Sequence, residues 1–498
     1  MTIQEAKEQI IRTVRAYLAK NEDGQWEIPV LAQRPILLMG PPGVGKTAIA
    51  QQAARACGVA LVSYTITHHT RQSAIGLPSI RTASYGGRTF SVTEYTMSEI
   101  IASVYRRMEE TGLEHGILFL DEVNCVSETL APAMLQFLQC KTFGSHRLPE
   151  GWVIVAAGNP PEYNRSVREL DIVTLDRVRR LDIEASWQAW KPYAYRQEVH
   201  PAILAYLELK PQHFYRLETT VDSKRFVTAR GWEDLSRLLT VSEKLELPVD
   251  ESVAAQYLQY PSIAKDFANY YDLYRKYRTD YDVEAILSGE LGERTVNRLR
   301  MAPFDERLSA LSLLLDGLFG SCREANEADA EVTLLHGQLK NLIAALETGR
   351  TAEDAFARVL EDCTRVREEK RRADLLEPAD ERRYAHVIAR LEDYRTALRR
   401  EDVTQPAAAA DRVRALFREA VAGRKAAIER ASLRLERGFA FLETVFGEGQ
   451  ELVIFLTELA MNPASTKFIA DNGCEKFSHY NRALLLGGRQ RSILEELD

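Results

Sequence analysis

The stretch PILLMGPPGVGKT, residues 35–47, joins an apolar run to a glycine-rich loop that ends in Lys46 and Thr47. The loop fits the pattern GxxxxGK[ST], and the residues after it, AIAQQAARA, have the composition of a helix. Glycines let backbone N–H groups approach phosphate oxygens, and the N-terminus of a helix favours negative charge. The segment therefore predicts a strand, a phosphate-binding loop and a helix in register, as in a nucleotide-binding α/β domain.

Each polar residue of this loop has an expected role. Lys46 should reach the β- and γ-phosphates, and the hydroxyl of Thr47 should bind Mg²⁺. A chance glycine-rich turn is the alternative, which the flanking strand and helix disfavour. The predicted nucleotide-binding residues are Gly40, Pro41, Pro42, Gly43, Val44, Gly45, Lys46, Thr47, Ala48 and Asp121.

A second apolar run, ILFLDE at residues 117–122, ends in two adjacent carboxylates. Asp121 is expected to bind Mg²⁺ through water, together with Thr47. Glu122 is expected to orient or activate the attacking water, so the pair indicates hydrolysis and not only nucleotide binding. The alternative is a solvated Asp-Glu pair at the end of a strand.

A third apolar run, WVIVAAGN at residues 152–159, ends in Asn159 followed by two prolines. In a parallel sheet, ligands bind beyond the carboxyl ends of the strands. We therefore expect the Asn159 amide to contact the γ-phosphate and the attacking water. A capping asparagine before a Pro-Pro turn is the alternative.

The order of these motifs along the chain resembles that of a known protein family. The loop at 40–47, FLDE at 119–122, GNP at 158–160 and LDRV at 175–178 together resemble AAA+ ATPases, and in detail the MoxR-like branch of the dynein-related AAA class. The resemblance covers about residues 10–270. It implies a P-loop α/β core with a parallel sheet and flanking helices, followed by a helical lid, and it makes Asn159 sensor 1.

The resemblance also implies roles for arginines. Arg177 corresponds to the arginine that enters a neighbouring subunit's site, although Val178 replaces the usual phenylalanine and Arg179 and Arg180 are alternatives. In FVTARGWEDLSRLL, residues 226–239, Arg230 corresponds to sensor 2, which reaches the γ-phosphate from the lid. A surface ion pair, which contributes little stability, is the alternative for Arg177 and Arg230.

The segment at 76–100 interrupts the α/β alternation with two β-type runs around Gly86-Gly87, which predicts a β-hairpin. MoxR-like proteins belong to the helix-2-insert group, in which insertions near this point often face the pore or the substrate. The tip residues Tyr85, Arg88 and Phe90 are therefore candidates for client contact, and a surface decoration is the alternative. Ile28 and Pro29, just before the first strand, are candidates for the adenine pocket.

The predicted organisation has three parts. Residues 1–185 form the α/β core with an N-terminal helix and the hairpin insert, residues 186–285 a helical lid with Tyr and Trp in its core, and residues 286–498 an all-helical region of unknown role. The charge-dense helical pattern of the last part predicts helical hairpins or a bundle, with a break at Pro406.

The composition of the chain limits the remaining classes of function and location. The net charge of −8 disfavours a nucleic-acid partner, and the longest apolar run, LVIFL at 452–456, is too short to span a bilayer. The first 20 residues lack the apolar core of a secretory signal. Six cysteines without a CxxC pair are typical of reduced cytosolic thiols, so we expect a cytoplasmic protein.

The expected function follows from the motifs and the resemblance together. We expect a Mg²⁺-dependent ATP hydrolase, and the resemblance implies a ring, a hexamer in this family, that remodels, matures or activates a client protein. Such clients often carry a von Willebrand factor A domain; this chain has no DxSxS motif, so that domain would be a separate polypeptide. The alternatives are a nucleic-acid motor and a non-hydrolysing, ATP-dependent switch or scaffold.

Overall fold

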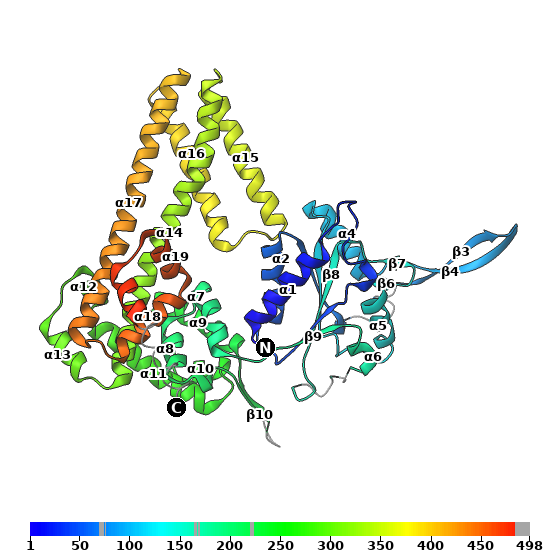
Figure 1. Cartoon of the computed structure of the whole chain (residues 1–498), viewed down its shortest axis with the longest axis horizontal. Helices are drawn as coiled ribbons and strands as arrows, with labels where there is room; N and C mark the ends of the chain where they lie inside the picture. Colours follow the sequence, from blue (N-terminus) through cyan, green and yellow to red (C-terminus); the bar gives the residue numbers. More distant parts are fainter. Residues whose placement is uncertain (69–73, 75, 164–166, 168–169, 220–223, 484–498) are drawn as a thin grey trace. The chain divides into compact units, whose positions relative to one another are not determined.

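The computed structural model describes residues 1–68, 74, 76–163, 167, 170–219 and 224–483 (Figure 1). The end of the predicted C-terminal region, 484–498, lies outside the described residues. The chain divides into two compact units. The first comprises Met1–Trp190, Thr228–Arg230 and Val366–Pro378, and the second comprises Lys191–Val227, Gly231–Arg365 and Ala379–Asp498.

The first unit is built on a five-stranded parallel sheet with the order β2-β5-β8-β1-β9. The four strands that the sequence predicts are confirmed, and β9 at the edge is an addition. Strands β1 and β8 are buried throughout because helices cover the sheet, which explains their uninterrupted apolar sequences. The strands are β1 Ile36–Met39, β2 Ala60–Thr65, β5 Gly116–Asp121, β8 Trp152–Gly158 and β9 Arg179–Asp182.

Helices flank this sheet, as predicted. Thr2 and Glu5 form a capping box that starts the first helix. Asp374, between α15 and α16, also belongs to this unit, where its side chain accepts hydrogen bonds from Gln51 (2.7 Å) and Arg55 (2.8 Å). The main helices are α1 Ile3–Tyr17, α2 Lys46–Cys57, α4 Glu99–Thr111, α5 Ala131–Cys140, α6 Ile172–Leu175 and α7 Trp187–Arg196, of which α7 continues into the second unit.

The predicted hairpin is present. Strands β3 Pro78–Tyr85 and β4 Arg88–Tyr95 pair antiparallel and project from the first unit (Figure 1). Gly86 and Gly87 have φ values of 59° and 80°, the left-handed conformation that a two-residue turn of this kind needs. A second, very short hairpin joins β6 Thr142–Phe143 to β7 His146–Arg147.

The part predicted as a helical lid is mainly helical but also contains a hairpin that the sequence did not predict. Apart from the buried Val227, its strands are largely exposed and mostly charged or polar, so they lack the apolar alternation that marks a strand. Tyr206, Trp232 and Phe267 pack together, in agreement with the expected aromatic core. The elements are α8 Pro201–Leu209, β10 Arg216–Thr219, β11 Lys224–Val227, α9 Ala229–Lys244, α10 Glu251–Tyr257 and α11 Pro261–Asp280.

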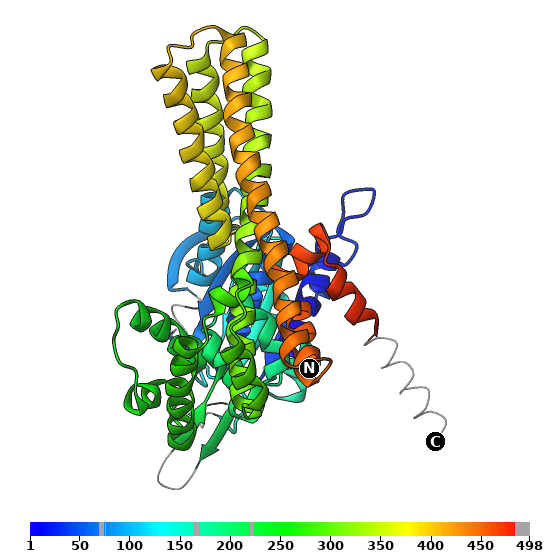
Figure 2. The same cartoon turned by 90° about the vertical axis from the view of Figure 1, so that its left-hand side faces the viewer.

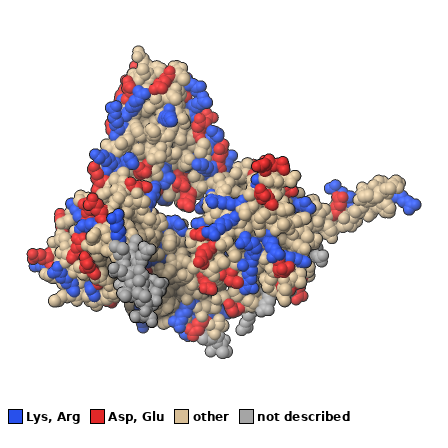
Figure 3. Space-filling view, viewed as in Figure 1, with Lys and Arg blue, Asp and Glu red and all other residues tan. Residues whose placement is uncertain are grey.

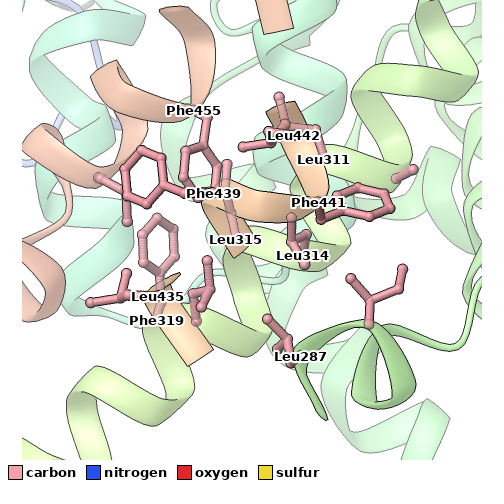
Figure 4. Packing of buried hydrophobic residues seen from close by; sticks show 14 of the residues in the cluster. Leu287, Leu311, Leu314, Leu315, Phe319, Leu435, Phe439, Phe441, Leu442 and Phe455 are labelled. Carbon is pink, nitrogen blue, oxygen red and sulfur yellow. The ribbon is translucent and has the colours of Figure 1, made fainter. Parts of the chain in front are cut away.

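The remaining described part of the chain consists of helices joined by short connections, as expected. The long helices α14 and α17 run side by side (Figures 1 and 2), and α17 begins at the predicted break, Pro406. Leu311, Phe439 and Phe455 belong to the apolar core between them and α18 (Figure 4). The helices are α12 Val283–Ser288, α13 Glu293–Met301, α14 Phe304–Glu347, α15 Ala352–Arg372, α16 Pro378–Arg400, α17 Pro406–Val445, α18 Gln450–Met461 and α19 Pro463–Asn472.

Among the described residues, no helix combines the length and the apolar character needed to cross a lipid bilayer.

Candidate nucleotide site

Lys46 is the centre of the predicted phosphate loop. Its ammonium donates hydrogen bonds to the carbonyl oxygens of Gly40 (2.7 Å) and Pro41 (2.9 Å) and to Oδ1 of Asn159 (2.8 Å). Burial lowers the pKa of Lys46 to about 8, the nearby Asp121 carboxylate opposes this shift, and the Arg230 charge adds to it. The structure therefore brings together two residues, Lys46 and Asn159, that lie 113 positions apart.

Thr47 and Asp121 meet at the carboxyl edge of the sheet. Thr47 lies in the first turn of α2, Asp121 ends β5, and Oγ1 of Thr47 lies 3.3 Å from Oδ2 of Asp121. A hydroxyl and a carboxylate are oxygen ligands of the kind that Mg²⁺ prefers. The donor set therefore fits the predicted metal-binding role of both residues.

Glu122 adopts a left-handed backbone conformation, with φ of 57°. Its N–H donates a hydrogen bond to Oδ1 of Asp121, and its Oε2 accepts one from the hydroxyl of Thr67 at 2.7 Å. Thr67 follows strand β2, so the carboxyl ends of two neighbouring strands supply both partners. The sequence analysis did not single out Thr67.

Asn159 is held by a second asparagine that the sequence analysis missed. Asn124 is 2% exposed; its Nδ2 donates to the carbonyl of Asn159 (2.7 Å), and its Oδ1 accepts from the N–H of Asn159 (3.3 Å). A Cβ at Gly158 would lie only 2.6 Å from that Oδ1. The Asn159 backbone is thus fixed by Asn124, which leaves its side chain to contact Lys46.

The segment Thr228–Arg230 lies against the phosphate loop within the first unit. Gly43 has a φ of 76°, and a Cβ there would come within 3.0 Å of the Thr228 side chain. Arg230 is exposed, two residues after Thr228, and its charge contributes to the lowered pKa of Lys46. The predicted sensor 2 residue is therefore close enough to the loop to influence it electrostatically.

The three candidate arginines after α6 differ in their contacts. Arg179 donates to the hydroxyl of Thr13 (2.6 Å), and Arg180 pairs with Asp182 (2.8 Å). The half-buried Arg177 side chain makes no hydrogen bond or ion pair within the described part of the chain. Hydrogen bonds from Thr174 lower the pKa of Asp171, and the Arg177 charge adds a smaller effect in the same direction. Of the three, Arg177 is the one whose guanidinium is not engaged.

Arg177 lies at the opposite edge of the sheet from the phosphate loop. In the parallel pairing of β1 with β9, Arg179 is opposite Ile36, at the start of β1, and Asp182 is opposite Met39, just before the loop. Since a strand rises about 3.3 Å per residue, β1 alone separates the two edges by about 10 Å. Arg177, two residues before Arg179, therefore lies toward the end of the sheet opposite to the phosphate loop.

The proposed adenine-pocket residues lie in the segment between α1 and β1. Ile28 is half-buried and Pro29 is exposed. The Gln33 side chain donates to the carbonyls of Ile28 (3.0 Å) and Tyr17 (3.0 Å), and it accepts from the buried ammonium of Lys141 (3.0 Å). This network fixes the segment, and the contact with adenine stays a prediction.

The candidate client-binding tip is exposed. Tyr85 and Phe90 are 62% and 48% exposed, and their ring centroids lie 6.3 Å apart. Arg88 is opposite Tyr85 in the hairpin register. The tip therefore presents two aromatic rings beside a cation.

Comparison with known families agrees with this geometry. Residues 35–178 match the AAA domain of the dynein-related subfamily, so this part of the chain is an AAA+ ATPase domain. The match begins just before β1 and ends directly after Arg177. A search of curated proteins finds no significant match to the chain.

Proposed function

We propose that this chain, which carries an AAA+ ATPase domain at residues 35–178, is a MoxR-like ATPase that hydrolyses ATP with Mg²⁺ in a ring and uses the energy to remodel or activate a partner protein. The observation that carries the proposal is the convergence of Lys46, Thr47, Asp121, Glu122 and Asn159 at one edge of the sheet.

The residues at this edge divide the work of hydrolysis. Lys46 and the loop N–H groups would hold the phosphates, and Thr47 with Asp121 would hold Mg²⁺, which would supply positive charge to offset that of the triphosphate. Asn159 is held by Asn124 beside Lys46, in reach of both phosphate and water. Glu122 orients the attacking water and accepts its proton once Thr67 releases the carboxylate.

The proposal of a ring rests on Arg177. An arginine near the amino ends of the strands can serve hydrolysis only in the site of another subunit. In such a site an arginine increases the rate of hydrolysis about a thousandfold or more. Ile172 and Val173, on the short helix before it, are 83% and 54% exposed. Exposed apolar side chains beside an unengaged arginine suit a surface that a second copy of the chain covers.

The client is the least defined part of the proposal. The exposed tip of the β3–β4 hairpin, with Tyr85 and Phe90, is the surface that we assign to client contact. A separate protein with a von Willebrand factor A domain is the client class that the family resemblance suggests. The helices after residue 286 would bind this partner or shape the ring.

The two alternatives are less well supported. Lys and Arg side chains are intermixed with Asp and Glu on the face seen in Figure 3, and the chain carries a net charge of −8, which does not favour a nucleic-acid partner. A non-hydrolysing switch would not need the Glu122 carboxylate beside Asp121. DNA-stimulated hydrolysis would favour the first alternative, and binding without turnover the second.

The experiment is ATP hydrolysis across a protein concentration series for the wild type, Glu122→Gln and Arg177→Ala. Specific activity should rise with concentration, and both variants should lose about a thousandfold in turnover while still binding ATP. Arg180→Ala is the matched control, because Asp182 already engages Arg180. Turnover by Arg177→Ala at the wild-type rate would overturn the trans-acting role.

A further inference from the structure

The turn between α15 and α16 folds with the unit that holds the nucleotide site. Residues Val366–Pro378 belong to the first unit, whereas Gly231–Arg365 and Ala379–Asp498 on either side belong to the second. Ala373 and Leu376 of this turn are buried. The helical region after residue 286, to which the sequence assigns no role, therefore contributes a short segment to the nucleotide-binding unit.

Asp374 connects this turn to α2. Its Oδ2 accepts a hydrogen bond from Nε2 of Gln51 (2.7 Å), and its Oδ1 accepts one from Nη2 of Arg55 (2.8 Å). The carbonyl oxygen of Asp374 accepts a third, from Nε of Arg55 (2.8 Å). Hydrogen bonds between a guanidinium and a carboxylate are stronger than neutral ones. A single residue of the turn is thus bonded to two successive turns of α2.

The local backbone does not favour an aspartate at this position. The N–H of Asp374 donates to the carbonyl of Arg371 (3.0 Å), and that of Leu375 donates to the carbonyl of Lys370 (2.9 Å), which is the Schellman motif that ends α15. Asp374 has a φ of 58°, the left-handed conformation that such motifs usually give to glycine. The helix dipole also disfavours a carboxylate at the C-terminus of a helix. The contact with α2 accounts for an aspartate here, and the turn itself does not.

The partners of Asp374 lie on the same side of α2 as Thr47. Thr47, Gln51 and Arg55 follow one another at intervals of four residues, the spacing that places side chains along one side of a helix. At 1.5 Å per residue, Gln51 lies about 6 Å and Arg55 about 12 Å along the axis from Thr47. Lys46 and Thr47 begin this helix of 12 residues, so a displacement of α2 would move both predicted nucleotide contacts.

We propose that Asp374 is a positioning residue for the nucleotide site. Through Gln51 and Arg55, it holds α2 where the first turn of that helix can bind phosphates and Mg²⁺. This inference rests on the proposed ATPase function and adds a role for the helical region. Because the turn continues into α15 and α16, a partner that displaces these helices acts on nucleotide affinity through the same contact. By reciprocity, a bound nucleotide stabilises the contact.

The first test is isothermal titration calorimetry of the full chain with MgADP. Asp374→Gly removes the carboxylate but keeps the turn, because glycine readily adopts this backbone conformation. Arg55→Met removes the other side of the contact. Each variant should weaken MgADP binding by about five- to tenfold, the lower end of couplings between distant sites. Gln51→Ala should also weaken binding, and Gln52→Ala is its matched control, because Gln52 makes no hydrogen bond within the described part of the chain.

The double variant Arg55→Met/Asp374→Gly separates the contact from independent effects of each residue. It should lose no more affinity than Arg55→Met alone, because the shared contact is lost only once. In the wild type, MgADP should slow amide hydrogen exchange in residues 366–378, a segment that carries none of the predicted nucleotide-binding residues.

Three results would overturn the positioning role while leaving the ATPase function intact. They are wild-type affinity in the single variants, losses that multiply in the double variant, and unchanged hydrogen exchange in residues 366–378. Absence of MgADP binding by the wild type would instead overturn the proposed ATPase function, and the positioning role with it.

Discussion

The hydroxyl of Thr67 donates a 2.7 Å hydrogen bond to Oε2 of Glu122, so the carboxylate assigned to the attacking water is already engaged by a neighbouring strand end. The Glu122 backbone is also held, by the bond from its N–H to Asp121. A carboxylate that keeps this bond has less capacity to accept the proton of a water molecule. Thr67 is therefore placed to restrain hydrolysis until the bond breaks.

Replacing Thr67 by valine tests this restraint. Valine keeps the shape but removes the donor, so we expect basal ATP turnover to rise about two- to tenfold, the equivalent of one neutral hydrogen bond of about 0.5–1.5 kcal/mol. Ser63→Ala, at an exposed position of β2, the strand that Thr67 follows, is the matched control. Unchanged or reduced turnover in Thr67→Val, at saturating ATP, would rule out the restraint.

The lowered pKa of Lys46, about 8, predicts a pH dependence of nucleotide binding. Phosphates favour the charged ammonium, so they raise this pKa on binding. Below about pH 8 the lysine is already charged; above it, binding must take up a proton and affinity should fall, by up to about tenfold per pH unit. Calorimetry at about pH 8.5 in two buffers of different ionisation enthalpy measures that uptake directly. Identical heats of binding in both buffers would contradict the predicted proton uptake.

Strands β1, β5 and β8 could be predicted because they are buried on both faces. Leu37 and Leu38 of β1, like Val153–Ala157 of β8, have no solvent side, so nothing interrupts their apolar sequence. Strand β9 was missed because RRLD carries three charges at the edge of the sheet, where its side chains reach solvent. Its pairing with β1 depends on the backbone and leaves no signal in the side chains.

The site residues also divide into those that a local sequence pattern predicts and those that only the fold brings together. The loop at 40–47 and Asp121-Glu122 follow local patterns and were predicted. Asn124 and Thr67 were not, because their partners lie 35 and 55 positions away and only the sheet order brings them together. The family resemblance favoured Arg177 but left Arg179 and Arg180 as alternatives, and only the fold shows that Arg179 contacts Thr13 and Arg180 contacts Asp182.

Buried Lys141 predicts a pH-dependent stability. Burial lowers its pKa to about 8, whereas in the unfolded chain it should titrate near its ordinary value, about 10.4. Between these values the unfolded state binds the extra proton, so the free energy of unfolding should rise with pH over this window. Lys141→Met removes this pH-dependent contribution. The free energy of unfolding of the wild type minus that of the variant, measured in urea titrations, should therefore increase from about pH 7 to pH 10. A constant difference would show that Lys141 is solvated.

Among the variants considered, Lys191→Met should lower the free energy of unfolding the most. The Lys191 ammonium is buried between Glu208 and Glu458, so Lys191→Met would remove this ammonium from both carboxylates, of which Glu458 is only 5% exposed. Breaking such a buried cluster costs about 3–5 kcal/mol, because the remaining charges stay desolvated.

The matched control is Lys476→Met, which breaks the half-exposed pair of Lys476 with Glu443 (2.7 Å) and should cost less than about 1 kcal/mol. Urea unfolding of both variants, followed by a probe in the helical part, gives the comparison. A loss for Lys191→Met no larger than that of the control would mean that water solvates the two carboxylates.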